Sequence, residues 1–173
     1  CYVTFGSLNN CAKLSRPSLE MWANVLQALP QSRLLIAGVP VGQAQQRLAE
    51  RLQALGIDRQ RIELRPPCVP REFFTLLDQV DIALDAQPFN GVTTTCDALW
   101  HGVPVIALAG NRTIARGGVS VLKAAGCAEW LANDPAEYVA IATSLAADLT
   151  QLQQVRATLR QRLRQSELLN ASG

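Results

Sequence analysis

The feature that most constrains this chain is the alternation of short apolar runs with longer segments of helical periodicity. The apolar runs span residues 2–5, 33–37, 62–64, 80–84, 103–108 and, shortest of all, 129–131. Most of these runs are continuously apolar, which is typical of strands buried on both faces of a parallel sheet. The alternation therefore predicts an α/β fold, with a doubly wound, Rossmann-like parallel sheet and helices on both of its faces.

The intervals between the apolar runs carry helix signals. Ser15 is a candidate N-cap with Pro17 in the first turn, and Pro30 ends the same segment. Further helices are expected at 43–55, 71–77, 93–101, 119–125 and 137–148, followed by a C-terminal helix at 149–168. The C-terminal helix contains four arginines. We expect these arginines to form a solvated face, and a basic surface for a partner is the alternative.

Length and composition exclude several classes of protein. The chain has 173 residues, of which 49% are apolar, so it can form one folded domain with a sizeable core. Its net charge of +2 is too small to indicate nucleic-acid binding. His101 is the single histidine, which excludes chemistry that needs paired histidines within this chain. No apolar run approaches the roughly 20 residues of a membrane helix, and we expect no signal peptide.

The cysteines and the N-terminus bear on the setting of the protein. Five cysteines, an odd number without a CxxC spacing, indicate reduced thiols in a cytoplasmic protein rather than a disulfide framework or a zinc site. The chain begins without a methionine and almost inside the first predicted strand. Residues 1–173 are therefore predicted to be a single domain that is a fragment of a longer protein.

The loops that follow the strands carry the polar candidates, because ligands of a doubly wound sheet lie beyond the carboxyl ends of the strands. Three such loops are 6–13, 85–92 and 109–118. The second loop leads into Thr93, Thr94 and Thr95, at the start of a predicted helix. A helix N-terminus has unpaired N–H groups and a partial positive charge, so it suits a phosphate. The stretch predicts a site for the diphosphate of a sugar nucleotide, and the threonines are expected to cap the helix as well.

Two residues beside this stretch have structural interpretations. Asp85 ends the fourth apolar run, and we expect it to brace the loop by accepting from backbone N–H groups. His101 precedes Gly102 at a predicted helix end, where a cation suits the helix dipole. A structural cap is therefore favoured over a catalytic role for His101.

Segments 5–13, 80–85 and 88–104 resemble the C-terminal catalytic region of O-linked N-acetylglucosamine transferases. The resemblance includes the SPINDLY-like bacterial relatives that carry tetratricopeptide repeats. Segments 22–26, 30–35 and 109–120 fit the same family, so the resemblance extends over nearly the whole chain. It implies the C-terminal, nucleotide-binding half of a GT-B glycosyltransferase.

The resemblance also implies roles for individual residues. Lys13 stands at the lysine that contacts the phosphates, and it is the residue expected to carry catalysis. The other residues expected to bind the nucleotide sugar are Asn10 near the diphosphate, Thr93, Thr94 and Thr95 at the helix start, Asp97 at the ribose and Arg116 facing the cleft. The spacing agrees for Asp97, because a carboxylate one turn into the helix lies on the same face as the loop.

The sequence departs from the family at two positions. Val92 and Phe73 stand where several relatives have histidines, the second of them near the uridine, so the base and the donor sugar are left open. There is no Asp-x-Asp motif for a divalent ion, and no metal and no cofactor is expected. A lysine, hydroxyls and helix N–H groups can stabilise the departing diphosphate without a metal.

The leading hypothesis is the donor-binding domain of an inverting glycosyltransferase that moves N-acetylglucosamine from a UDP-sugar to protein serine or threonine. The partners are then the UDP-sugar, a protein acceptor, the missing N-terminal GT-B half and tetratricopeptide repeats, without nucleic acid. One alternative is a non-catalytic module that has lost donor binding. Another is a different GT-B enzyme, such as an asparagine glucosyltransferase or a sugar epimerase. The fragment alone is expected to be inactive.

Overall fold

A computed structural model describes residues 2–170. Its centre is a sheet of six parallel strands in the order β3-β2-β1-β4-β5-β6. The strands are β1 Thr4–Ser7, β2 Arg33–Ile36, β3 Ile62–Leu64, β4 Ile82–Leu84, β5 Val105–Leu108 and β6 Leu131–Ala132. This order confirms the predicted doubly wound, Rossmann-like sheet, in which the winding direction reverses between β1 and β4.

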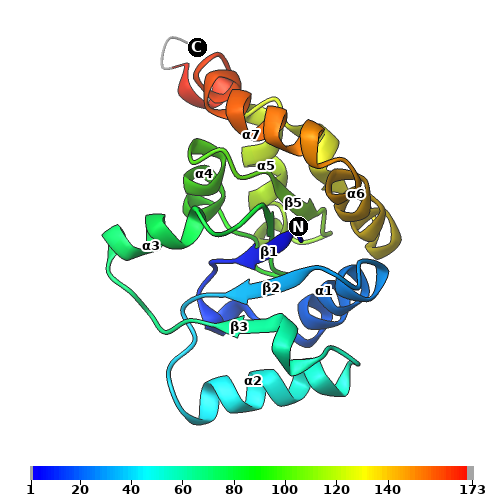
Figure 1. The fold of residues 1–173 in the computed structure, drawn as a ribbon. Coiled ribbons are helices and arrows are strands. Elements are labelled where there is room, and N and C mark those ends of the chain that lie inside the picture. Colours follow the sequence, from blue (N-terminus) through cyan, green and yellow to red (C-terminus); the bar gives the residue numbers. More distant parts are fainter. Residues whose placement is uncertain (1, 171–173) are drawn as a thin grey trace.

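Helices connect all of the strands and cover both faces of the sheet (Figure 1). They are α1 Arg16–Ala28, α2 Gln43–Ala54, α3 Pro70–Leu77, α4 Thr93–Trp100, α5 Gly117–Ala124, α6 Pro135–Ala147 and α7 Leu149–Arg164. Short 3₁₀ helices lie between them: η1 Cys11–Lys13, η2 Arg59–Arg61, η3 Thr113–Ala115, η4 Ala128–Trp130 and η5 Glu167–Leu169. Ser15 caps α1 by accepting from the N–H of Ser18, as predicted.

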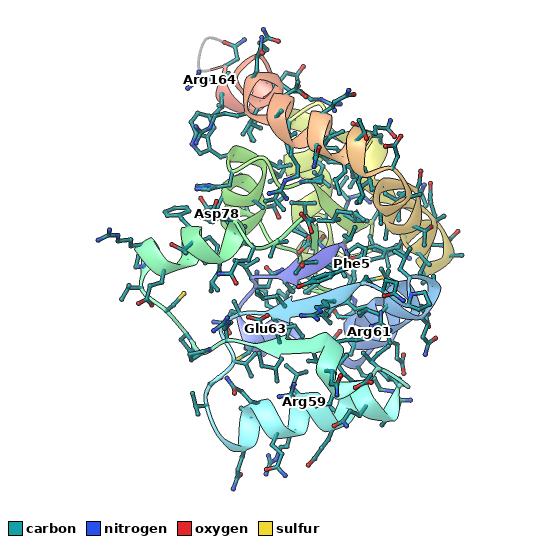
Figure 2. All side chains as sticks on the ribbon, viewed as in Figure 1. Phe5, Arg59, Arg61, Glu63, Asp78 and Arg164 are labelled. Atoms are coloured by element: carbon teal, nitrogen blue, oxygen red, sulfur yellow. The ribbon has the colours of Figure 1, made fainter. Side chains whose placement is uncertain are left out.

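The core consists of two apolar layers, one on each face of the sheet. Alternate residues of each strand point to opposite faces. Phe5, at the centre of the sheet in Figure 2, packs with Trp22 of α1 and Tyr138 of α6. On the other face, Leu35, Leu99 of α4 and Leu122 of α5 belong to a second apolar cluster. Burial on both faces explains why the strands read as continuous apolar runs.

The first strand begins and ends two residues later than predicted. The predicted run ends at residue 5, whereas Gly6, the residue that follows it, lies inside β1. A Cβ at Gly6 would stand 2.4 Å from Cγ2 of Val80, so the strand needs a glycine where this side chain crosses it. The expected C-terminal helix also ends early, at Arg164, and η5 follows it.

The arginines of α7 also contact other elements: three form hydrogen bonds or an ion pair, and the fourth, Arg164, lies over the ring of Trp100. Arg156 donates to the carbonyls of Val80 and Asp81. Arg160 donates to the carbonyl of Trp100 at 3.0 Å and lies over its ring. Arg162 forms an ion pair with Glu129 at 2.6 Å. Arg160, Arg162 and Arg164 are nonetheless exposed, so the expected solvated face is confirmed for these three, and Arg156 is half-buried. Carbonyls at the ends of neighbouring elements attract the guanidinium groups that lie beside them.

Two further features concern the predicted setting. The four cysteines among the described residues are free thiols, and Cys1 lies outside the described residues. Within residues 2–170, no helix has the length and apolar character needed to cross a membrane.

Candidate functional site

The candidate site lies beyond the carboxyl ends of β1 and β4, where the sheet reverses its winding. Asp85 directly follows β4 and is only 2% exposed. Its Oδ1 accepts from the backbone N–H of Ala86 at 2.8 Å and of Gly91 at 2.7 Å. The carboxylate therefore closes the segment from 86 to 91, called the donor loop below, on itself. The predicted bracing role of Asp85 is confirmed.

Asn9 joins the loop after β1 to the donor loop and to α4. Its side chain is buried, with 6% exposed. Its Nδ2 donates to Oδ1 of Asp85 at 3.2 Å, and its Oδ1 accepts from the hydroxyl of Thr94 at 3.1 Å. Asn9 was not among the predicted site residues. The Asn9-Asn10 pair marked the place, but the chain alone did not show which of the two turns inward.

Asn10 shapes the local turn. Its Oδ1 accepts from the N–H of Ala12 at 2.9 Å and caps η1, and the residue is exposed. This short helix carries Lys13, whose Nζ donates to the carbonyl of Asn90 at 3.1 Å. The structure therefore brings Lys13 against the donor loop, as a phosphate-contacting role requires. It does not connect the Asn10 side chain to that loop by any hydrogen bond among the described residues.

The threonines lie in the first turn of α4. Thr93 is exposed, Thr94 is half-buried and Thr95 is buried. The N-cap position is Val92, and no side chain caps the helix. The expectation that the threonines cap α4 is therefore wrong, because they occupy the first three helical positions rather than the position before them. The uncapped N–H groups of this turn are available to an anion.

Gly91 allows the loop to approach α4 closely. A Cβ at this position would lie 2.5 Å from the hydroxyl of Thr94, 2.8 Å from that of Thr95 and 3.0 Å from Oδ1 of Asn9. Three side-chain oxygens thus converge on the backbone of the loop. Any larger residue would push the loop away from the helix start.

A second helix start closes the site from the side of β5. A Cβ on Gly118 would meet Oδ2 of Asp85 at 2.8 Å, and a Cβ on Gly117 would meet Cγ2 of Val92 at 2.9 Å. The N–H of Asn90 also donates to the carbonyl of Ile114 at 3.3 Å. The glycine pair thus lets α5 pack directly on Asp85 and the donor loop.

The remaining predicted residues are near this cluster in the chain but are not bonded into it. Asp97 is half-buried on α4, and Arg116 is exposed at the start of α5. Neither side chain has a hydrogen bond or an ion pair to a described residue. His101 ends α4 and stacks on Phe74 with ring centroids 4.7 Å apart. This contact agrees with a structural role for His101.

Electrostatics single out Asp85. Burial raises the pKa of its carboxyl from 3.8 to about 6, although hydrogen bonds from Gly91, Ala86 and Asn9 and the charge of Lys13 oppose the rise. Tyr138 of α6 donates to the carbonyl of Asp85 at 3.3 Å. Burial first, and the charge of Asp85 second, hold the pKa of Tyr138 well above its usual value. A buried carboxylate with a raised pKa is the kind of group that marks functional sites.

The two departures from the family pattern differ in their surroundings. Val92 is 53% exposed at the edge of the site. Phe73 is half-buried on α3, and its ring meets that of Phe74 edge-on at 5.7 Å. Within residues 2–170, no group of three or more histidine, cysteine, aspartate or glutamate side chains is arranged to hold a metal ion.

A doubly wound sheet with an uncapped helix start at its switch point defines a Rossmann-like domain. The chain matches glycosyl transferase family 41 over residues 2–172, and it belongs to that family. It is 37% identical over 174 residues to a Petunia hybrida protein named "Probable UDP-N-acetylglucosamine--peptide N-acetylglucosaminyltransferase SPINDLY". That alignment covers 99% of this chain and 19% of the relative.

Other relatives show the same partial coverage. A Caenorhabditis elegans protein named UDP-N-acetylglucosamine--peptide N-acetylglucosaminyltransferase is 30% identical over 155 residues, which is 90% of this chain and 13% of that protein. A solved structure of a mutant Thermobaculum terrenum O-GlcNAc transferase has a TM-score of 0.90 and 34% identity, over 96% of this chain and 32% of that one. Anabaena HepE, solved with UDP and glucose, shares the fold at a TM-score of 0.69 and 16% identity, over 95% and 44% of the two chains.

Proposed function

We propose that this chain is the donor-binding half of an inverting, metal-independent glycosyltransferase. The reaction proposed for the whole protein is transfer of N-acetylglucosamine from UDP-N-acetylglucosamine to a protein serine or threonine. One observation carries the proposal: Asn9 and Asp85 hold the loop after β1, the donor loop and the start of α4 together. This arrangement places the ammonium of Lys13 beside the donor loop.

In this proposal the chain stabilises the departing diphosphate. Lys13 supplies a positive charge, and Thr93 and Thr94 supply hydroxyls and backbone N–H groups at the helix start. Groups that are already oriented toward the developing charge lower the barrier without needing a metal ion. Asp97, one turn further along α4, accepts from the ribose hydroxyls, and Arg116 contributes charge from the start of α5.

The acceptor side of the reaction belongs to the rest of the protein. The chain spans about a fifth of the length of the plant relatives that it matches. A GT-B active site lies between two domains, so the missing half supplies the acceptor cleft and the catalytic base. The names of the plant and nematode relatives support a peptide acceptor and UDP-N-acetylglucosamine as the donor.

Val92 and Phe73 favour a second candidate, a family member that keeps the fold but has lost donor binding. Both positions carry apolar side chains where the resemblance implies histidines. Calorimetry on the full-length protein separates the two. Binding of UDP at micromolar to low millimolar concentration supports the enzyme, whereas no heat up to several millimolar supports the non-catalytic module.

Calorimetry on the full-length protein also tests which base and which sugar the site binds. The first comparison is among UDP, GDP and CMP, and we expect UDP to bind most tightly. A set of UDP-sugars then tests the donor, and we expect UDP-N-acetylglucosamine to turn over with a peptide acceptor. A preference for GDP or CMP would reject the uridine assignment, and turnover on free asparagine side chains would favour a different GT-B enzyme.

A further inference from the structure

Among the described residues, three buried side-chain oxygens near the carboxyl ends of β1 and β4 have no hydrogen-bond partner, and one of them is the hydroxyl of Ser7. The other two are Oδ2 of Asp85 and Oδ1 of Asn90. Both side chains lie against the same face of Gly118: the position of a Cβ there would be 2.8 Å from Oδ2 of Asp85 and 3.5 Å from Cγ of Asn90. An unsatisfied buried acceptor is costly, and two that face the same point call for a common explanation.

The other polar atoms of these two side chains are already engaged. Nδ2 of Asn90 donates to the carbonyl of Ala86 at 3.0 Å, which fixes Oδ1 as the free end of the amide. Oδ1 of Asp85 accepts from Asn9, Ala86 and Gly91. The two remaining atoms are both acceptors, so neither can satisfy the other while Asp85 is ionised.

A proton on Oδ2 of Asp85 would resolve this conflict. A protonated carboxyl is a donor through one oxygen and still an acceptor through the other. Oδ1 would keep its three donors, and Oδ2–H would donate to Asn90. The small cavity next to Asp85, of about 20 Å³, is lined by neither Asn90 nor Gly118, so a water molecule held there would not bridge the two oxygens.

We propose that Asp85 is a positioning residue which takes up a proton, shared with Asn90, when the diphosphate of a nucleotide sugar binds at the start of α4. The proposal rests on the proposed function of the site. Asp85 contacts the donor loop rather than the substrate. Asp85 is hydrogen-bonded to Asn9, and Asn9 is hydrogen-bonded to Thr94 in the first turn of α4. An anion bound at this turn would therefore lie close to the carboxylate of Asp85.

The sign of the coupling follows from the charges. A second negative charge near a carboxylate disfavours its ionised form, so the bound diphosphate favours the protonated acid. Since the pKa of Asp85 is about 6, the carboxyl is mostly ionised at neutral pH and has a proton to gain. The proton comes from the buffer.

Few other titratable groups face Asp85. Lys13 of η1 acts on it through its charge, and Tyr138 of α6 donates to its main-chain carbonyl. Strands β1 and β5 carry no titratable side chain. The starts of α4 and α5 meet Asp85 and its loop through threonine and glycine positions, and Arg116 at the start of α5 is exposed. Lys13 favours the ionised form of Asp85, and the diphosphate offsets that influence when it binds.

The test is calorimetry of UDP-N-acetylglucosamine binding to the full-length protein near neutral pH, in two buffers with different ionisation enthalpies. This ligand is suitable because its diphosphate is a diester without a proton to exchange in this pH range. If the bound anion raises the pKa of Asp85 by about one further unit, uptake is roughly 0.4 proton per ligand. Buffer-independent heat, or proton release, would overturn the proposal.

Asp85→Asn identifies the group. The amide keeps an acceptor oxygen for the three donors and presents an N–H to Asn90, so it imitates the protonated acid. We expect no proton uptake and, near neutral pH, about fivefold tighter binding than in the natural protein, because no protonation is needed. The gain should vanish near pH 5.5. Weaker binding by this variant at neutral pH, or uptake that persists in it, would reject the assignment to Asp85.

Asp81→Asn is the matched control, since Asp81 ends the same strand at the opposite edge and also accepts a backbone N–H. It should leave both affinity and proton uptake unchanged. Failure of the proposed function is separately visible, as absence of binding heat in the natural protein. A circular-dichroism melt of each variant excludes unfolding as the cause of any change.

Discussion

Strand β4 carries an aspartate at each end, and the two aspartates have opposite surroundings. Asp81, at the amino end, accepts from the N–H of Thr4 at 2.8 Å and lies 3.8 Å from the guanidinium of Arg156. Its side chain is 39% exposed. Asp85, at the carboxyl end, is buried and has no ion-pair partner among the described residues. At the amino end, the charge of Asp81 is paired and accessible to water, whereas at the carboxyl end the charge of Asp85 is unpaired and buried.

The contrast extends beyond the two carboxylates. At the amino edge, Arg156 and Arg160 of α7 donate to carbonyls just before β4 and at the end of α4. Gly102 turns the chain with a φ of 76° against the backbone of Arg156. At the carboxyl edge, oxygens remain unpaired and the first turn of α4 remains uncapped. Substitutions at the two edges should therefore separate stability from function.

Lys13→Ala should produce the largest functional effect at the carboxyl edge. Loss of one preorganised donor costs on the order of 3 kcal/mol in the barrier, so turnover of the full-length enzyme should fall by roughly 100-fold or more. The melting temperature should change little, because the lysine makes one hydrogen bond to the donor loop. Steady-state kinetics with UDP-N-acetylglucosamine and a peptide measures the effect.

Lys123→Ala is the control, because Lys123 is the only other lysine and lies exposed on α5. Its turnover should equal that of the natural protein. Near-normal turnover in Lys13→Ala would show that Lys13 is not part of the proposed site. The charge of Lys13 at the carboxyl edge would then have no role in catalysis.

The second prediction concerns stability against pH. The folded-state pKa of Asp85, about 6, lies above its ordinary value of 3.8, so the folded chain binds this proton more tightly than the unfolded chain. The contribution is fully present below about pH 4 and is lost as the pH rises through about 6. Its size is on the order of 3 kcal/mol. Denaturant titrations should show the natural protein losing stability relative to Asp85→Asn between these pH values.

Asp81→Asn provides the comparison at the other end of the strand. This variant keeps Asp85, so its stability should fall with rising pH as that of the natural protein does. If the difference in unfolding free energy between the natural protein and Asp85→Asn does not change from acid to neutral pH, then burial does not destabilise the ionised form of Asp85. The two ends of β4 would then be electrostatically alike.

The sequence was sufficient to predict the fold, and the reason is physical. Strands buried on both faces need continuous apolar runs, and the turns between elements need residues such as Gly56, with a φ of 83°, and Pro135 at a helix start. Strand ends were less predictable. Gly6 reads as a stop signal, and only the tertiary contact with Val80 explains why it lies inside β1.

The site was predictable only in part. Lys13 and the first turn of α4 carry the chemistry of an anion site, so they could be identified from residue type and position. Asn9 could not be identified in this way, because its role depends on a contact with Asp85, which lies 76 residues away in the chain. The contacts of the α7 arginines were unpredictable for the same reason, because their carbonyl partners belong to other elements and cannot be read from a helical pattern.

At the amino edge, Arg156→Ala should reduce stability without affecting the site. Its removal leaves the carbonyls of Val80 and Asp81 without their side-chain donor. Loss of partners for buried groups costs about 2 kcal/mol, which a denaturant titration resolves. The affinity for UDP should stay within twofold of the natural value. Arg16→Ala, on an exposed arginine of α1, is the matched control and should change neither quantity. A large loss of UDP affinity in Arg156→Ala would show that the two edges are coupled.

Thr94→Val should give the smallest effect, and it should appear in both quantities. The substitution keeps the shape of the side chain but removes the hydroxyl that donates to Oδ1 of Asn9 at 3.1 Å. A hydrogen bond of this kind contributes about 1 kcal/mol, so we expect that loss of stability and roughly fivefold weaker UDP binding. Thr158→Val, which removes an exposed hydroxyl bonded only within α7, should change neither. If Thr94→Val loses stability but keeps its affinity, the Asn9 bridge belongs with the structural contacts of the amino edge, and Lys13 alone would carry the anion site.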